Sequence, residues 1–372
     1  MFQLDPIFAT IAADPMAYAR RWKADTGRPV IGTLCSYAPE EIVTAAGGLP
    51  LRLLTTGGGD QGADAHLQAY SCSLVRGALS DWLEGRLAAL DGTVFAHTCD
   101  SMQRLSDIWR LTSRDRFHAD VLWPATVTAP GAEAYSVEML KDFAADYGRY
   151  FQTVIDDAAL VAAARLHNRI RGGLRRLYAL RRERPGLVPG RDWLALMRAA
   201  MVMDRQALAD ALDALTAALA RQPTTVFQGR RLLLAGGVCE APAIYETIEA
   251  AGAQVVWDDL CTGWRYAAGE IDVTGDVWTA LARRYLRRSV CPAKHAGLTY
   301  RADELIAAAR QAEADGVVFL YLKFCDPHLF DYPYLKQRLA AADLPCLMVA
   351  LEDPRAAEGQ LRTRLEAFIE ML

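Results

Sequence analysis

The cysteines are the residues of this 372-residue chain whose placement suggests chemistry. Five of the eight stand at the end of an apolar, β-branched run: Cys35, Cys99, Cys239, Cys261 and Cys325. Such runs are typical of buried strands in a parallel sheet, and ligands bind outside the carboxyl ends of those strands. We therefore expect these thiols to gather at the sheet edges, where they would serve a shared metal or redox site.

Six of the cysteines form two triplets: Cys35, Cys72 and Cys99, then Cys261, Cys291 and Cys325. In each triplet the outer two end a strand, whereas the middle one opens a helix (Cys72) or begins a loop (Cys291). The spacings, 37 and 27 residues and then 30 and 34, are wider than in zinc ribbons or in the dense run of bacterial ferredoxins. They suit a cluster held in a cleft by thiolates from several strand ends.

Taken singly, each cysteine is better explained as a small core hydrophobe, because free cysteine is among the most buried residue types. Cys346 lies inside an apolar run and is assigned to the core, while Cys239 fits neither triplet and both interpretations stay open for it. A functional role is favoured for Cys72 and Cys99, because helix N-termini lower thiol pKa values and stabilise anions. A thiolate-ligated iron–sulfur cluster is such an anion.

Strand and helix signals alternate at both ends of the chain. Strands are predicted at residues 30–34, 49–54, 93–99, 232–237, 254–257, 316–322 and 344–351. Residues 136–219 are predicted to form two or three amphipathic helices, and a final helix ends at Leu372. This alternation indicates parallel sheets. We expect an α/β fold with two Rossmann-like parallel-sheet domains, residues 1–135 and 226–372, and an intervening helical segment at 136–225.

Composition excludes several functional classes. The net charge of −4 gives no reason to expect nucleic-acid binding, and no apolar run is long enough to span a bilayer. The N-terminus lacks a basic region followed by an apolar stretch, so no export signal is visible and a cytoplasmic location is expected. In a reducing cytoplasm the cysteines are expected to be core residues, catalytic thiols or metal ligands rather than disulfides.

Several segments resemble the family that contains 2-hydroxyacyl-CoA dehydratases, benzoyl-CoA reductases and double-cubane cluster proteins. They are GTLCSYAPEEIVTAAGGLPLRL (32–53), CSLVRGAL (72–79), LDGTVFAHTCDSMQRLSDIW (90–109), DDLCTGWRY (258–266), GVVFLYLKFCDPHLFDYPYL (316–335) and GQLRTRLEAFIEML (359–372). The resemblance implies paired Rossmann-like domains with an iron–sulfur cluster in the cleft between them. In the dehydratases and benzoyl-CoA reductases, the cysteines matching Cys72, Cys99 and Cys325 hold a [4Fe–4S] cluster.

The double-cubane branch uses three more cysteines to hold an [8Fe–9S] cluster, and the matching residues are Cys35, Cys261 and Cys291. Because this chain has all six, the resemblance favours the double cubane over [4Fe–4S]. It also implies electrons from a separate ATP-hydrolysing iron–sulfur activator. This chain has no G-x-x-x-x-G-K-[ST] phosphate loop, so nothing in it indicates that it hydrolyses ATP itself. A double-cubane protein would resemble homodimers, and a dehydratase or reductase subunit would pair with a homologous chain.

Three functions follow from this resemblance. The favoured one is an oxidoreductase that reduces a small molecule; the others are a [4Fe–4S] subunit of an acyl-CoA dehydratase or reductase, and a non-catalytic electron carrier. Reduction needs protons, and His97 and His328 are the candidate donors because they flank Cys99 and Cys325, although each is equally explained as a loop residue. The arginines between Arg165 and Arg184 are predicted to form a solvated helix face rather than a grip for CoA phosphates.

Overall fold

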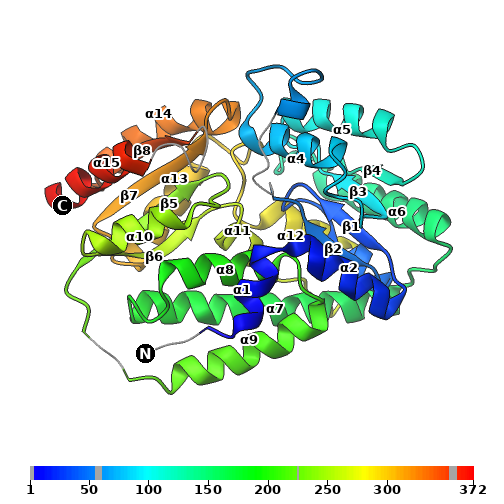
Figure 1. Cartoon of the computed structure of the whole chain (residues 1–372), viewed down its shortest axis with the longest axis horizontal. Coiled ribbons are helices and arrows are strands. Elements are labelled where there is room, and N and C mark those ends of the chain that lie inside the picture. The colour runs from blue at the N-terminus through cyan, green and yellow to red at the C-terminus, as the bar shows by residue number, and fades with distance from the viewer. Residues whose placement is uncertain (1–3, 55–60, 224–225, 352–357) are drawn as a thin grey trace.

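The computed structural model describes residues 4–54, 61–223, 226–351 and 358–372 (Figure 1). The strands are β1 (Val30–Thr33), β2 (Leu49–Arg52), β3 (Gly92–Phe95), β4 (Phe117–Asp120), β5 (Arg230–Gly236), β6 (Ala253–Asp259), β7 (Gly316–Leu322) and β8 (Cys346–Leu351). The helices of the first half are α1 (Pro6–Ala13), α2 (Pro15–Thr26), α3 (Glu40–Ala45), the 3-10 turn η1 (Gln61–Ala63), α4 (Ser73–Leu83), α5 (Asp100–Thr112), α6 (Ala132–Phe151) and α7 (Asp157–Glu183). Those that follow are α8 (Gly190–Ala200), α9 (Arg205–Ala220), α10 (Pro242–Ala250), α11 (Trp264–Ala267), α12 (Val277–Arg287), α13 (Tyr300–Gln311), α14 (Asp326–Ala340) and α15 (Glu358–Met371).

The described strands form two four-stranded parallel sheets with equivalent topologies. Their orders are β2-β1-β3-β4 and β6-β5-β7-β8, so the first, second, third and fourth strand of each half take corresponding places. The predicted α/β class with two Rossmann-like sheets is therefore confirmed. The similarity between the two halves of the chain, which the sequence shows only in its cysteines, extends to the strand order of the two sheets.

The strand ends differ from the prediction in the first half. The strand expected at residues 93–99 ends at Phe95, so Cys99 is not a strand residue but the N-cap of α5. The sequence analysis also missed β4, because its FHAD sequence has no run of β-branched residues. It aligns with β3 through four parallel register pairs, from Gly92 with Phe117 to Phe95 with Asp120.

The middle of the chain contains four helices, α6 to α9, rather than the two or three predicted. The break after α6 was missed because neither glycine nor proline marks it: Gln152 adopts a left-handed conformation (φ 53°), and the Asp156 side chain caps α7. The break before α9 is likewise made by an aspartate, Asp204, whose side chain accepts the amide hydrogens of Gln206 and Ala207. Both aspartates satisfy amide groups that a new helix leaves without partners.

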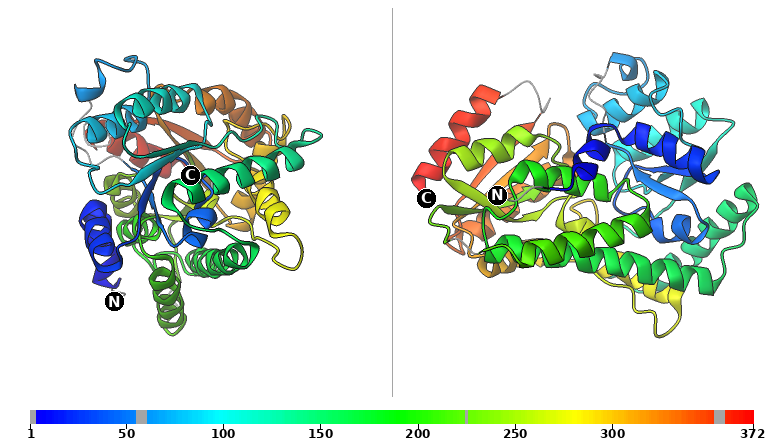
Figure 2. Two further views of the ribbon diagram at one scale, coloured as in Figure 1. Left: turned by 90° about the vertical axis from the view of Figure 1, so that its right-hand side faces the viewer. Right: turned by 60° about the horizontal axis from the view of Figure 1, so that its bottom comes forward.

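The helical segment joins the two sheets rather than simply separating them. Helix α7 contacts α3 and α12 near one sheet and β6 of the other, and it runs beneath both in the views of Figures 1 and 2. Helix α12, which lies within the predicted C-terminal domain, packs on α6 and shares a core with Val94 and Phe117 of the first sheet. The hydrophobic core therefore crosses the predicted boundaries of residues 136–225.

Two adjacent buried carboxylates bind this arrangement together. Glu41 accepts hydrogen bonds from Arg171 Nη1 (2.7 Å) and from the Tyr285 hydroxyl (2.8 Å), on α7 and α12. Glu40 accepts from Arg205 Nη2 of α9 and from the Tyr266 hydroxyl of α11, each at 3.0 Å. One turn of α3 thus contacts four helices through charged hydrogen bonds.

We expect Glu41→Gln to lower the free energy of unfolding by about 3 to 5 kcal/mol, because breaking a buried ion pair leaves a buried charge uncompensated. Burial alone would raise the pKa of Glu41, but His167, Arg171 and Arg284 hold it well below its usual range, so the carboxylate is charged at neutral pH. Urea-induced unfolding would measure the loss.

The matched control is Glu138→Gln, because Glu138 forms an exposed pair with Lys141 and such pairs contribute about 0 to 1 kcal/mol. Equal unfolding midpoints for the two variants would contradict the role given to Glu41.

Candidate metal centre

Three of the predicted ligands stand at the beginning of helices that meet at one cavity. Cys72, Cys99 and Cys325, here called the helix-cap cysteines, are the N-cap residues of α4, α5 and α14. The backbone N–H groups of Val75, Met102 and His328 in the first helical turns act to lower the pKa values of these thiols, although no sulfur forms a side-chain cap hydrogen bond. Amide hydrogens and the positive ends of three helix dipoles are therefore directed at these sulfurs, which favours an anion there.

The cavity bounded by these three cysteines has a volume of about 780 Å³. Its other walls are the loop of residues 292–298, between α12 and α13, and the first turns of α5 and α14. Helix α14 of the second half faces α4 and α5 of the first half across this region in Figure 1. The helix-cap cysteines thus come from both halves of the chain, as the resemblance implied.

Without a metal these thiols are neutral. Burial raises the pKa of Cys99 and of Cys325 to about 12, and it also raises the pKa of Cys72. Only a nearby positive charge would favour their thiolates, and metal binding supplies such a charge while releasing the protons. These three thiols therefore fit a site at which metal binding drives their ionisation to thiolates.

The other three predicted ligands, Cys35, Cys261 and Cys291, lie next to the helix-cap cysteines and are here called the loop cysteines. The side chains of Cys261 and Cys291 are hydrogen-bonded to each other, and Arg265 Nη1 lies 3.4 Å from Cys261 Sγ. The hydrogen bond from Cys291 lowers the pKa of Cys261, and Arg265 lowers it further, so Cys261 is the thiol of this pair that ionises first. Cys35 accepts a weak hydrogen bond from Thr98 Oγ1 at 3.6 Å.

Pairwise electrostatic interactions connect the six sulfurs, including one between Cys325 and Cys99, and we call this group of cysteines the ring. The neighbours around it are Cys72, Cys99, Cys35, Cys291, Cys261 and Cys325, which returns to Cys72. The three cysteines of each half follow one another in this circuit, and the halves meet at Cys35 with Cys291 and at Cys325 with Cys72. Among the described residues, no three His, Cys, Asp or Glu side chains lie close enough together to hold a single metal ion.

Buried cations surround the ring, and the sequence analysis did not identify them. Lys294 interacts with Cys35, Cys99 and Cys291, while Arg52 and Arg265 interact with Cys261. Arg52 is 5% exposed and its Nε has no hydrogen-bond acceptor within the described parts of the chain. An unsatisfied buried guanidinium nitrogen near Cys261 fits an anionic group that this thiol would help to hold.

The two histidines predicted as proton donors lie beside the site rather than on the lining of the 780 Å³ cavity. His97, at a positive φ of 33°, directs Nε2 to Asp120 Oδ1 at 2.7 Å. His328 places Nδ1 3.1 Å from Cys325 Sγ, and burial lowers its pKa to about 3, so its ring is neutral at neutral pH. Their role in proton transfer stays a prediction.

Other sequence features take structural roles. Cys239 is fully buried, and its backbone N–H donates to Thr262 Oγ1, away from the ring of sulfurs. Cys346 begins β8, half-buried against Tyr332 rather than fully in the core. Asp258 accepts a hydrogen bond from the backbone N–H of Trp264, the first residue of α11, at 2.8 Å.

The arginines of α7 bond to protein groups. Arg169 and Arg176 pair with carboxylates of α9, and Arg175 pairs with Glu270. Arg181 and Arg184 donate to backbone carbonyls. Arg169, Arg175 and Arg176 are at least partly exposed, as predicted for a solvated helix face, whereas Arg171 and Arg181 are buried and the prediction is wrong for them. None of the helices in the described parts of the chain combines the length and apolar character of a membrane span.

Comparison with known proteins finds similarity along almost the whole chain. The family model described as 2-hydroxyglutaryl-CoA dehydratase, D-component, matches residues 35–372. One of the benzoyl-CoA reductase subunits of Thauera aromatica is 30% identical over 95% of this chain and 94% of its own. The beta subunit of (R)-2-hydroxyglutaryl-CoA dehydratase from Acidaminococcus fermentans is 25% identical over 98% of both chains. The putative dehydratase subunit YjiM of Escherichia coli is 28% identical over 94% and 92%.

Gly263 provides a test of the turn that positions Cys261 and Arg265. A Cβ at this residue would lie 1.8 Å from Asp258 Oδ1, so Gly263→Ala must displace the carboxylate that caps α11. We expect this overpacking to cost about 1 to 3 kcal/mol, measured as a lower thermal unfolding midpoint. Gly275→Ala is the control, since its Cβ would meet nothing within 4 Å. Equal midpoints for both variants would contradict the steric argument.

Proposed function

Because this chain belongs to the 2-hydroxyglutaryl-CoA dehydratase D-component family, we propose that it is the cluster-bearing reductase component of an ATP-dependent system. It would hold a double-cubane [8Fe–9S] cluster, accept low-potential electrons from a separate ATP-hydrolysing iron–sulfur activator, and reduce a small molecule. The observation that carries this proposal is the ring of six cysteines. A [4Fe–4S] cluster needs only part of that ring.

The ligands of the cluster would be the helix-cap and loop cysteines together: Cys35, Cys72, Cys99, Cys261, Cys291 and Cys325. When bound, such a cluster supplies electrons at low potential. The protein's part is to hold thiolates at three helix N-termini, to exclude water by burial, and to balance negative charge with Arg52, Arg265 and Lys294. Charge, burial and hydrogen bonds to sulfur are the means by which proteins tune cluster potentials.

The substrate would enter the 780 Å³ cavity beside Cys72, Cys99 and Cys325. Protons for its reduction are assigned to His97 and His328, whose imidazoles adjoin the ligand loops at Asp120 and at Cys325. His328 carries a single ring proton at neutral pH. It would therefore donate that proton only if another group supplied a new proton to the ring. The identity of the substrate is left to experiment because family members differ in what they convert.

The mouth of the cavity has the character of a partner surface. Leu298, Phe324 and Phe330 line it and are 77%, 37% and 85% exposed. Exposed apolar side chains that gather at one place mark interaction sites on protein surfaces. We assign this face to the activator, because electrons must be delivered close to the thiols that line the same cavity.

A second candidate function is supported by the names of the relatives, which are those of reductase and dehydratase subunits. In this alternative the chain would carry one [4Fe–4S] cluster on Cys72, Cys99 and Cys325 and would act with a homologous chain on an acyl-CoA. The double cubane assigns a role to the three loop cysteines, and this alternative does not.

We expect anaerobically purified protein to contain about eight irons per chain. Cys35→Ser and Cys291→Ser should each reduce that number, because each removes one of the loop cysteines. Iron and acid-labile sulfide analysis would measure the content. Cys239→Ser and Cys346→Ser are matched controls outside the ring and should keep the full complement.

Two results would contradict the double cubane. One is about four irons per chain; the other is unchanged iron in the Cys35 and Cys291 variants. Both favour the [4Fe–4S] subunit. A full cluster that cycles its oxidation state with activator and ATP, but converts none of the substrates tried, would instead favour an electron carrier.

We expect Phe330→Asp to slow ATP-dependent reduction of the protein by about tenfold at limiting activator, because a charge in an apolar contact must be desolvated. Anaerobic stopped-flow absorbance would follow the reduction. Val154→Asp is the control, since Val154 is also 85% exposed and lies in the turn between α6 and α7. Equal rates for both variants would remove this face from the activator interface.

A further inference from the structure

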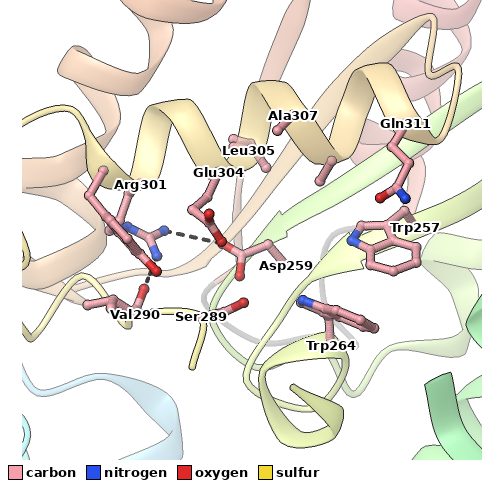
Figure 3. A pocket seen from close by; sticks show the side chains of 12 residues that line it. Trp257, Asp259, Trp264, Ser289, Val290, Arg301, Glu304, Leu305, Ala307 and Gln311 are labelled. Carbon is pink, nitrogen blue, oxygen red and sulfur yellow. Dashed lines mark hydrogen bonds and ion pairs between the residues drawn. The ribbon is translucent and has the colours of Figure 1, made fainter. Parts of the chain in front are cut away.

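A second cavity opens in the C-terminal half, on the other side of the Asp259–Arg265 pair from Cys261. Its volume is about 360 Å³, and residues of β6, α11 and α13 line it together with Ser289 and Val290 (Figure 3). Arg301 is shared with the lining of the larger cavity, but no cysteine lines this one. Nothing in the proposed reductase function uses it.

Two tryptophans form one wall. The rings of Trp257 and Trp264 lie 4.3 Å apart between centroids and are tilted by 48°. Trp257 is 7% exposed, yet neither indole N–H has a hydrogen-bond acceptor within the described parts of the chain. Figure 3 shows both indole nitrogens turned toward the side where Asp259 and Glu304 lie. Unpaired indole donors in a cavity point to a ligand that carries an oxygen acceptor.

The opposite wall carries two carboxylates, Asp259 and Glu304. Asp259 pairs with Arg265 at 2.7 Å and with Arg301 at 3.4 Å. Glu304 lies near Asp259 but has no cationic partner among the described residues. Burial and then the charge of Asp259 raise the pKa of Glu304. A ligand cation would relieve that repulsion.

The charge, the aromatic wall and the free donors select one kind of ligand. Aromatic rings beside a carboxylate favour organic cations, with tryptophan the strongest partner. An inorganic metal ion is not favoured, since the described residues offer it no set of three ligands. We propose that this cavity binds a small organic ammonium ion bearing a hydroxyl or carbonyl oxygen. Glu304 pairs with the ammonium, Trp257 and Trp264 cover its carbon groups, and an indole N–H donates to its oxygen.

Choline is a suitable probe, and 3,3-dimethylbutan-1-ol is its uncharged counterpart of the same shape. Isothermal titration calorimetry of the anaerobically purified protein is expected to detect choline and to show at least about tenfold weaker binding of the neutral alcohol. Glu304→Gln should weaken choline binding about tenfold. Asp303→Asn is the matched control: Asp303 is on the same helix but pairs with Arg338 outside the cavity, so affinity should be unchanged.

Trp264→Leu should weaken choline about 2- to 30-fold, the range expected for loss of one aromatic contact with a cation. If that variant does not fold, the exposed Glu304 substitution decides the matter alone. Absence of choline binding, equal affinity for choline and the alcohol, or an unchanged affinity in Glu304→Gln would each overturn the proposal. Iron content does not enter these measurements, so failure of the double-cubane assignment would leave them interpretable.

Discussion

The buried carboxylates of α3 are the constraint on which the rest of the molecule depends. Glu40 and Glu41 begin α3, the helix that comes after β1 and Cys35, and they bond to side chains of α7, α9, α11 and α12. Removing one partner would leave a charge in a region that water does not reach, and such a charge costs far more than an exposed one. The elements that carry Cys35, Cys261 and Cys291 are therefore held in one arrangement by charge pairing as well as by apolar packing.

That constraint explains how thiols from distant parts of the chain meet. Cys35 follows β1, Cys261 follows β6, and Cys291 follows α12, which packs on α6 and α7 and also donates hydrogen bonds to the α11 segment. Because Tyr285 of α12 donates to Glu41, the turn that positions Cys35 also fixes the helix that leads to Cys291. The helix-cap cysteines are positioned differently, by the N-terminal turns of α4, α5 and α14. Two mechanisms, ion pairing and helix capping, thus position two sets of ligands around one space.

The sequence predicts the sheets well because their strands are buried on both faces and are continuously apolar. It predicts poorly where structure depends on side chains without that pattern: β4 is short and polar, and the helix breaks at Gln152 and Asp204 carry no glycine or proline. The six ring cysteines were identifiable from strand ends and from family resemblance. The cations around them were not, because Arg52 reaches Cys261, and Lys294 reaches Cys35 and Cys99, only through long-range folding.

The charges that surround the ring also connect it to the second cavity. Arg265 is 1% exposed and contacts Cys261 Sγ on one side and both carboxylate oxygens of Asp259 on the other. Its charge is therefore divided between a thiol and the lining of the ammonium-ion cavity. A cation that binds beside Asp259 would compete with Arg265 for the same carboxylate. Arg265 would then stabilise the Cys261 thiolate more strongly. Water does not screen a buried guanidinium, so a change of charge in one cavity alters the electrostatic potential in the other.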